Sequence, residues 1–208
     1  MKINTFVLGN IQTNCYLLES EKEAVIIDPA IYSDRIANYI SENNLDLKYI
    51  LLTHNHFDHT LGSTEFAEKF SASIAIGEDD YNILGDSLLN GADLFGFSKL
   101  KSPSADIKLS EGSIISFGDS ELRVIETPGH TAGGISYFTK GHLFCGDSLF
   151  RMSIGRTDLP GGDYDTLISS ICNKLYILDD DTVVYPGHGA ITTIGWEKKN
   201  NNYTKIYD

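Results

Sequence analysis

The sequence predicts an α/β protein in which two sheet-plus-helix halves form an α/β/β/α sandwich. Three observations predict this four-layer fold. Short apolar runs, separated by Gly, Asn and Asp residues typical of turns, occur in both halves of the chain and indicate β-strands. Segments with apolar residues at helical spacing follow strands in each half. Histidine or aspartate comes directly after several of the apolar runs, so loops from both halves are expected to meet at one edge.

The first half is expected to begin with three strands and to continue in β, α, β order. Residues 3–28 contain the apolar runs INTFVL, NCYLLE and AVIIDP. Ser33 is a typical N-cap for a helix that ends near Asn43. A strand at Tyr49–Leu52 and a helix at Thr60–Phe70 follow. This order is typical of layered α/β folds.

A strand at Ser73–Ile76 and a short helix at Glu78–Leu84 are expected to end this half. Residues 85–104 then carry three glycines and a proline among apolar residues. This segment is either a lid over the site or a partly buried connection, and the second interpretation is favoured. The chain shows no domain boundary, internal repeat or low-complexity tract, so residues 1–208 are expected to form a single domain.

The second half again consists of apolar runs and closes with helices. The runs SIISF, ELRVIET, GISYFT and HLFCGD are separated by Gly and Asp turn residues. Asp163 predicts the start of a helix at Tyr164–Tyr176, whose apolar residues recur at helical spacing. A strand at Thr182–Tyr185 and a short helix near Gly195–Asn200 follow.

Composition and charge limit the classes of function. A hydrophobic content of 41% and a charged content of 22% are those of an ordinary globular protein. The net charge of -13 argues against a nucleic-acid partner, because phosphate binding requires clustered Lys and Arg. No apolar run reaches the length of a membrane span, and the start MKINTFVLGN has no long apolar region. We therefore expect a cytoplasmic protein without a membrane partner.

The three cysteines are expected to be free thiols. Cys15, Cys145 and Cys172 are an odd number and lie far apart in the chain. They form neither a disulfide framework nor a C-x-x-C zinc pattern. Buried thiols in a reducing compartment are the favoured interpretation.

The stretch THNHFDH at residues 53–59 places four metal-binding side chains within six positions. Imidazole nitrogens and carboxylate oxygens are ligands that Zn²⁺ and related ions prefer. If the preceding apolar run is a strand, His54 and His56 project to the same side of the chain. Asp58 and His59 are offset by the turn and point to a neighbouring position. This loop is therefore predicted to serve two adjacent ions.

Three further residues follow apolar runs and stand beside glycine. They are His130 in ETPGHTAGG, Asp147 in LFCGDSLF and His188 in VVYPGHG. Together with the first motif they make five histidines and two aspartates, which exceed the needs of one tetrahedral zinc and suit two ions bridged by a carboxylate. His142 lacks this context and is interpreted as a surface or strand-end residue. Asp28, at the end of a strand, is either a turn residue or a partner of the ligands.

The order of these motifs resembles that of the metallo-β-lactamase superfamily of hydrolases. T-H-x-H-x-D-H, G-H-T, G-D-S-L-F and P-G-H-G occur in that order over nearly the whole chain. The stretches GRTDLPGGD at 155–163 and YPGHGAITTIGWE at 185–197 are similar to the short bacterial glyoxalase II-like, or hydroxyacylglutathione hydrolase-like, branch. The resemblance implies an αββα sandwich. It also implies no separate C-terminal glutathione-binding helical domain, because only about 20 residues follow His188.

The resemblance also implies roles for the candidate residues. Arg156 occupies the place of a basic residue that contacts the thiol-derived half of the substrate, with a surface arginine as the alternative. Zinc is the favoured ion, with iron and manganese as alternatives. The implied ligands are His54, His56 and His130 for one ion, Asp58, His59 and His188 for the other, and Asp147 as the bridge.

The expected reaction is hydrolysis of an acyl thioester similar to S-lactoylglutathione. Two cations lower the pKa of a shared water, and the resulting metal-bound hydroxide attacks the thioester carbonyl. Asp58 is the expected catalytic residue, because its carboxylate can accept a hydrogen bond from that hydroxide and aim it. A small-molecule thioester is thus the predicted partner. The sequence does not indicate the thiol carrier or the oligomeric state.

Two other functions stay open. Persulfide dioxygenases of the same superfamily use one iron held by two histidines and one carboxylate, and they share a sequence similar to residues 156–158. A metal-binding module without catalysis is the alternative from another class. It predicts an intact metal site without thioester turnover, and the full set of seven ligands disfavours it.

Overall fold

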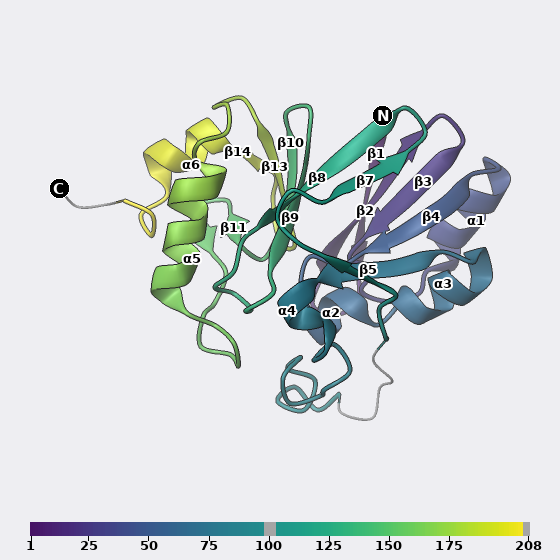
Figure 1. Ribbon diagram of the computed structural model, residues 1–208, viewed down its shortest axis with the longest axis horizontal. Helices are drawn as coiled ribbons and strands as arrows, with labels where there is room; N and C mark the ends of the chain where they lie inside the picture. Colours follow the sequence, from purple (N-terminus) through teal and green to yellow (C-terminus); the bar gives the residue numbers. More distant parts are fainter. Residues whose placement is uncertain (98–102, 206–208) are drawn as a thin grey trace.

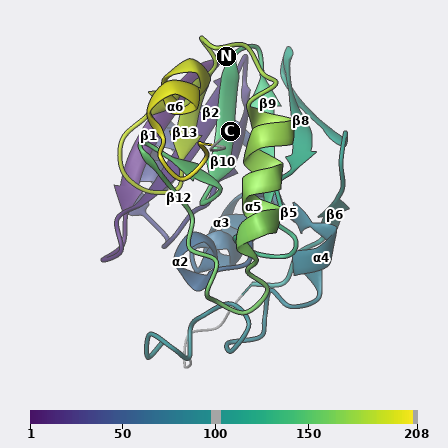
Figure 2. The ribbon, with the colours of Figure 1, turned by 90° about the vertical axis from the view of Figure 1, so that its left-hand side faces the viewer.

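Two β-sheets packed face to face, each covered on its outer side by helices, make up the computed structural model (Figure 1). It describes residues 1–97 and 103–205. The predicted αββα sandwich is confirmed. In Figure 1, α1 and α3 lie outside the first sheet, and α5 and α6 lie outside the second. Figure 2 shows α5 and α6 side by side in front of the second sheet.

The first sheet has six strands among the described residues, in the order β1-β2-β3-β4-β5-β6. Strands β1 to β3 are antiparallel neighbours, and β3 to β6 are parallel. The elements of this half are β1 (Lys2–Leu8), β2 (Thr13–Ser20), β3 (Glu23–Ile27), α1 (Asp34–Glu42), β4 (Asp46–Leu51), α2 (Phe57–Thr60), α3 (Ser63–Phe70), β5 (Ser73–Gly77), α4 (Glu78–Tyr81) and β6 (Ile107–Leu109).

The second sheet also has six strands in the described part of the chain, in the order β14-β13-β10-β9-β8-β7. All its neighbours are antiparallel except β10 and β13, which are parallel. The elements of this half are β7 (Ile114–Phe117), β8 (Ser120–Glu126), β9 (Ile135–Thr139), β10 (His142–Gly146), the separate hairpin β11 (Leu149–Phe150) and β12 (Ser153–Ile154), α5 (Tyr164–Ser170), the π-helical turn η1 (Ile171–Leu175), β13 (Val183–Pro186), β14 (Thr192–Thr193) and α6 (Ile194–Asn200).

Alternating residues of the strands fill the layers of the core. In β2, Cys15 and Leu17 belong to the cluster that packs against α1 and α3, whereas Tyr16 and Leu18 lie between the two sheets. Both faces of such a strand are buried, so its sequence is an apolar run rather than an alternation of apolar and polar residues. Burial on both faces explains why the strands could be predicted as apolar runs.

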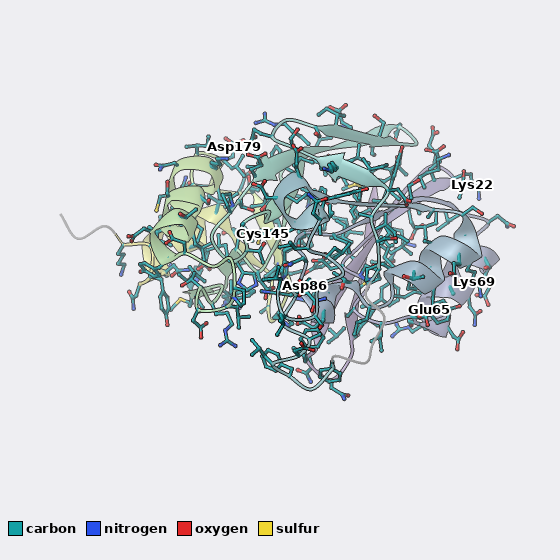
Figure 3. All side chains as sticks on the ribbon, turned by 60° about the horizontal axis from the view of Figure 1, so that its bottom comes forward. Lys22, Glu65, Lys69, Asp86, Cys145 and Asp179 are labelled. Carbon is teal, nitrogen blue, oxygen red and sulfur yellow. The ribbon has the colours of Figure 1, made fainter. Side chains whose placement is uncertain are left out.

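The second sheet repeats this arrangement around β10. Cys145 packs in the cluster with α5, η1 and α6, whereas Phe144 faces the first sheet. Figure 3 shows Cys145 in the interior, while Lys22, Glu65 and Lys69 project from the periphery of the first half. These three charged side chains therefore lie outside the sandwich. No helix in the described ranges has both the length and the hydropathy required to cross a bilayer.

The structure corrects several predicted boundaries. The helix expected at Thr60–Phe70 begins at Phe57 and is interrupted before Ser63. Gly62 causes the interruption: its N–H donates to Pro29 O at 2.8 Å, and a Cβ there would overlap the backbone of Ile31. Close approach of this backbone to the loop after β3 thus divides one helix into α2 and α3.

Other elements are shorter or longer than expected. The helix predicted at Tyr164–Tyr176 ends its α-helical part at Ser170 and continues as η1, where Tyr176 N donates to Ile171 O at 2.8 Å. Strand β4 starts at Asp46 rather than Tyr49, and α4 ends at Tyr81 rather than Leu84. The short strands β6, β11, β12 and β14 were not predicted, because two or three residues carry no periodic signal.

Residues 85–97 contain turns and lie against α2. Asn90 O accepts a hydrogen bond from Phe57 N at 3.0 Å, and the Phe97 ring stacks on Phe57 with centroids 5.1 Å apart. These contacts agree with a partly buried connection. Residues 98–102 of the predicted 85–104 segment lie outside the described residues, and both the lid and the single domain stay predictions.

The predicted cap of α5 allows a test of stability. Asp163 accepts a hydrogen bond from Thr166 N at 2.8 Å, whereas Ser33 at the start of α1 makes no such side-chain bond. We expect Asp163→Ala to lower the free energy of unfolding measurably, because an orphan N–H at the start of α5 loses its partner. Urea unfolding of the metal-free protein measures the change. Ser33→Ala is the matched control, and an equal loss there would contradict the role of the Asp163 cap.

Candidate metal centre

The candidate ligands lie where four strands end at one edge of the sandwich. β10 and β13 are parallel, and β8 has the same direction because both β8 and β10 are antiparallel to β9. The first sheet joins this edge through Thr53 O, which accepts a hydrogen bond from Ile135 N at 2.8 Å. The loops after β4, β8, β10 and β13 therefore meet, although they lie far apart in the sequence.

All seven predicted ligands come together at this edge. They form three overlapping groups, and in each group the candidate ligand atoms lie within 4.8 Å of one another. Asp147 lies between the two sides of the cluster: its carboxylate is 3.4 Å from His59 Nε2 and 3.7 Å from His130 Nε2. The groups are His54, His56 and His130; His54, His59 and Asp147; and Asp58, His59 and His188.

The first side of the cluster offers neutral imidazoles. His56 Nδ1 and His130 Nε2 are 2.9 Å apart, and His54 is fully buried beside them. Burial, followed by the charges of neighbouring histidines, lowers the pKa of His54 well below its ordinary value and that of His56 to about 3. Neutral imidazole is the form that binds metal.

The second side of the cluster requires positive charge. Burial alone would lower the pKa of His59, but Asp147, Asp58 and Asp28 raise it to about 10. Burial alone would raise the pKa of Asp58, but His59 and His188 hold it below its ordinary value. A divalent cation at this position would replace the bound proton, as metal binding to histidine and carboxylate sites does.

Unpaired polar atoms indicate that the cluster fits metal ions. His54 Nε2, His56 Nε2 and Asp147 Oδ1 are buried and have no hydrogen-bond partner among residues 1–97 and 103–205. Buried polar atoms without a partner are costly and require an explanation such as an ion. For His54 Nε2 and Asp147 Oδ1, coordination of a divalent cation supplies that explanation. His56 differs, because it faces His130 and the cluster with Nδ1 rather than with Nε2.

Asp28 holds two of the histidines through their other ring nitrogen. Its carboxylate accepts hydrogen bonds from Thr53 N at 2.8 Å, Thr53 Oγ1 at 2.7 Å and His59 Nδ1 at 3.0 Å. His54 Nδ1 in turn donates to Thr53 Oγ1 at 3.0 Å. Both histidines therefore direct Nε2 into the cluster. Of the two roles considered for Asp28, the structure favours that of a partner of the ligands.

Asp80, an anchor of the first histidine group, was not predicted. Asp80 is buried and accepts hydrogen bonds from Asn55 N, between His54 and His56, and from Thr131 Oγ1 and Gly133 N, after His130. The distances are 3.0, 2.8 and 2.9 Å. Asp80 thus joins the loops after β4 and β8. No residue pattern indicates this role of Asp80, because it stands in an acidic run with Glu78 and Asp79.

Arg156 contacts the cluster through its backbone rather than its side chain. His130 Nδ1 donates to Arg156 O at 2.7 Å, which directs His130 Nε2 toward Asp147. The guanidinium is half exposed and forms a two-point ion pair with Asp158, both distances being 2.7 Å. The structure therefore places the Arg156 side chain on the surface beside the cluster.

The loop that carries His188 is fixed by the start of β2. Asn14 donates from Nδ2 to Pro186 O and Gly189 O, both at 3.0 Å, and its N–H donates to Gly187 O at 2.7 Å. Gly187 itself packs so closely that a Cβ would overlap Asp147 Oδ1. The glycines beside the predicted ligands thus allow the close approach that was expected of them. His142 lies at the start of β10, as predicted for a strand-end residue.

Comparison with known proteins identifies the family. The sequence profile of the metallo-beta-lactamase superfamily matches residues 8–188. The chain belongs to this superfamily. It is 39% identical over 207 residues to hydroxyacylglutathione hydrolase GloC of Haemophilus influenzae, with 98% of each chain covered. The protein is therefore a metallo-hydrolase of this superfamily, and its His and Asp cluster indicates divalent metal ions.

Solved structures share the fold over most of the chain. The B3 metallo-beta-lactamase BLEG-1 is 38% identical, with a TM-score of 0.92 and coverage of 99% of this chain and 100% of the other. TTHA1623 in a di-iron-bound form is 33% identical, with a TM-score of 0.83 and coverage of 96% and 99%. ETHE1 from Myxococcus xanthus is 30% identical, with a TM-score of 0.82 and coverage of 97% and 84%.

Two glycines of the His188 loop provide a matched test of the cluster geometry. A methyl group at Gly187 would displace Asp147 and His59, whereas no atom lies within 4 Å of a Cβ at Gly189. We expect Gly187→Ala to purify with less than half the metal of the wild type. Gly189→Ala, whose φ of 76° strains an alanine but whose Cβ meets no atom, is expected to keep its metal. Elemental analysis and far-ultraviolet circular dichroism measure metal content and fold. Full metal occupancy in Gly187→Ala would contradict the crowded geometry.

Proposed function

We propose that the protein hydrolyses acyl thioesters with two divalent metal ions, zinc being the favoured pair. The observation that carries this proposal is the division of the cluster into two sides with Asp147 between them. His54, His56 and His130 would hold one ion. Asp58, His59 and His188 would hold the other, and Asp147 would contact both. Similarity to a hydroxyacylglutathione hydrolase supports the choice of thioester.

The ions would supply a water of lowered pKa and polarise the substrate carbonyl. In the overall reaction, the water oxygen forms a bond to the carbonyl carbon, the C–S bond breaks, and the sulfur leaves with the electron pair. The products are a carboxylic acid and a thiol. Because a thiolate leaves easily, little help from a general acid is needed.

The residues of the chain would position these reactants. Asp58 has its carboxylate 3.3 Å from His188 Nε2 and is partly exposed at the mouth of the cluster. There it can accept a hydrogen bond from the attacking water and aim it, which is a positioning role as well as a ligand role. Asp28 and Asp80 would keep the histidines oriented while the substrate binds.

The alternatives predict different products. A mononuclear-iron persulfide dioxygenase would contain one iron per chain and consume oxygen with glutathione persulfide. The similarity to ETHE1 keeps this alternative open. Because the chain is similar to BLEG-1, a β-lactam should be tested for hydrolysis beside the thioester and the persulfide. A metal-binding module would turn over none of these compounds.

The ligand assignment is tested by single substitutions. We expect His56→Ala and Asp147→Ala to lose metal and to lower kcat/KM for S-lactoylglutathione by at least a thousandfold, with the fold retained. The physical reason is that each removes a ligand that no neighbouring side chain replaces. Metal analysis, circular dichroism and thioester kinetics measure the three properties.

His142→Ala is the matched control for these variants. His142 lies at the start of β10, where its ring contacts Tyr185 Oη at 3.1 Å. We expect this variant to keep both metal and activity. Normal turnover by a His56→Ala or Asp147→Ala protein that holds a single ion would contradict the two-metal proposal.

The role of Arg156 is tested by its effect on KM. We expect Arg156→Ala to raise KM several-fold with kcat and metal content nearly unchanged, because the carbonyl that orients His130 belongs to the backbone. Arg123→Ala is the matched control, since Arg123 of β8 is an exposed arginine that forms an ion pair with Glu111. A KM for Arg156→Ala equal to that of wild type would remove its side chain from the substrate site.

A further inference from the structure

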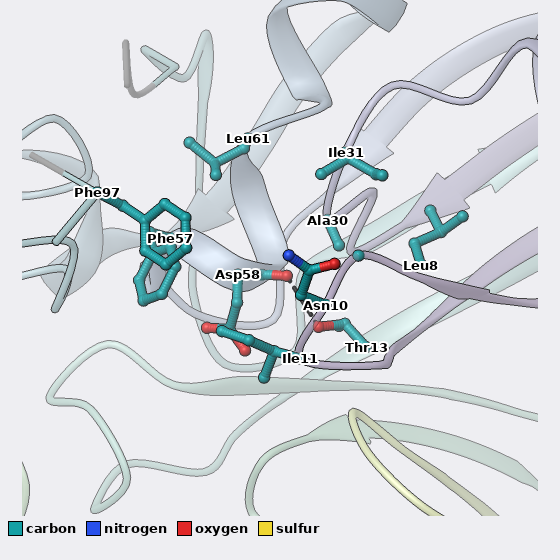
Figure 4. Close-up of a pocket in the computed structure, with 11 residues that line it drawn as sticks. Leu8, Asn10, Ile11, Thr13, Ala30, Ile31, Phe57, Asp58, Leu61 and Phe97 are labelled. Atoms are coloured by element: carbon teal, nitrogen blue, oxygen red, sulfur yellow. Dashed lines mark hydrogen bonds between the residues drawn. The ribbon is translucent and has the colours of Figure 1, made fainter. Parts of the chain in front are cut away.

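An apolar pocket of about 190 Å³ opens beside Asp58 (Figure 4). Its walls come from four segments: the stretch from the end of β1 to the start of β2, the loop after β3, α2 with the residue after it, and Phe97. Leu8 and Ile11 come from the first and Ala30 and Ile31 from the second. Asp58 is the one ionisable side chain among the described residues that line the pocket. A ligand there would meet mainly hydrocarbon.

Part of the pocket's hydrocarbon faces solvent. Ile11 and Ile31 are more than 40% exposed, although both line a concave surface. α2 adds Phe57 and Leu61 to the wall, and Thr13 Oγ1 fixes α2 by donating to Asp58 O at 2.9 Å. A preformed, mainly apolar pocket with a few polar groups, here those of Asn10, Thr13 and Asp58, is the usual form of a small-molecule site.

The pocket and Arg156 lie on opposite sides of the cluster. Asp58 belongs with His59 and His188, so the pocket adjoins that side. Arg156 contacts His130, which belongs with His54 and His56. A thioester lying across the cluster would therefore have one half near a cation and the other half in hydrocarbon.

We propose that this pocket binds the acyl chain of the substrate and selects apolar acyl groups of about four to six carbons. The proposal rests on the thioester hydrolysis proposed above. An apolar cavity of about 150 Å³ accommodates benzene, so about 190 Å³ has room for a short chain. The opposite side, with the Arg156 guanidinium at the surface, would take the more polar thiol carrier.

Chain length provides the test. Glutathione thioesters with acetyl, butanoyl and hexanoyl groups share one thiol and differ only in methylenes. With the metal-loaded wild-type protein, kcat/KM is expected to rise about fifteenfold from acetyl to butanoyl and further to hexanoyl, because each buried methylene contributes about fourfold. S-lactoylglutathione, whose acyl group carries a hydroxyl, is expected to fall below the butanoyl compound.

Substitutions at the rim of the pocket test whether the preference for longer acyl chains arises from the pocket rather than from the rest of the site. Ile11→Asp puts a carboxylate into the pocket and is expected to reduce the gain from acetyl to hexanoyl to less than threefold. Ile31→Asp, on another segment, should do the same. Ile177→Asp is the matched control: Ile177 is 76% exposed and lines a different surface, so the gradient should persist.

A binding measurement distinguishes failure of this proposal from failure of the proposed function. Calorimetry with the metal-loaded protein is expected to give at least tenfold tighter binding of hexanoate than of acetate, and Ile11→Asp should remove the difference. Thioester turnover with no dependence of rate or affinity on chain length would overturn the pocket assignment alone. Hexanoate preference without turnover of any thioester would instead overturn the proposed function and, with it, the acyl assignment.

Discussion

The buried carboxylate of Asp28 holds the site together, because one side chain ties the ends of two strands to a helix. It receives three hydrogen bonds from Thr53 and His59, and through Thr53 it also fixes His54. Its backbone has a φ of 50°, in the left-handed region, where Asp is better tolerated than most residues. Loss of this carboxylate would leave a buried hydroxyl and a buried imidazole without their acceptor.

Other loops of the cluster are also held by hydrogen bonds to groups outside it, although the accepting group differs from loop to loop. Asp80 joins the loops that carry His56 and His130, and the Arg156 carbonyl orients His130. Each anchor satisfies the ring nitrogen or backbone group that does not face the cluster. Two of the atoms that face the cluster, His54 Nε2 and Asp147 Oδ1, have no hydrogen-bond partner among the described residues, which is an arrangement that metal ions stabilise.

The layers and the residues that come together in the cluster could be predicted from the sequence for physical reasons that do not extend to the anchors. Buried strands produce apolar runs, and a ligand must be one of a few side-chain types, so residues such as His54 and Asp147 stood out after strand ends. The Arg156 contact is made by a carbonyl that every residue possesses, so no residue type indicates it. The contacts of Asp80 arise only because the fold brings two distant loops together. The break at Gly62 likewise arises from the packing of one backbone segment against another.

The attachment of the His188 loop to the start of β2 has a consequence for the order of assembly. Asn14 holds backbone atoms up to 175 residues further along the chain, and His59 meets His188 across a separation of 129 residues. The early strands therefore cannot complete these contacts before the last part of the chain has been synthesised. Contacts of such separation are slow to close, which delays high-affinity metal uptake until the final loop has joined the first sheet. Capture of the metals would then mark the end of folding rather than its beginning.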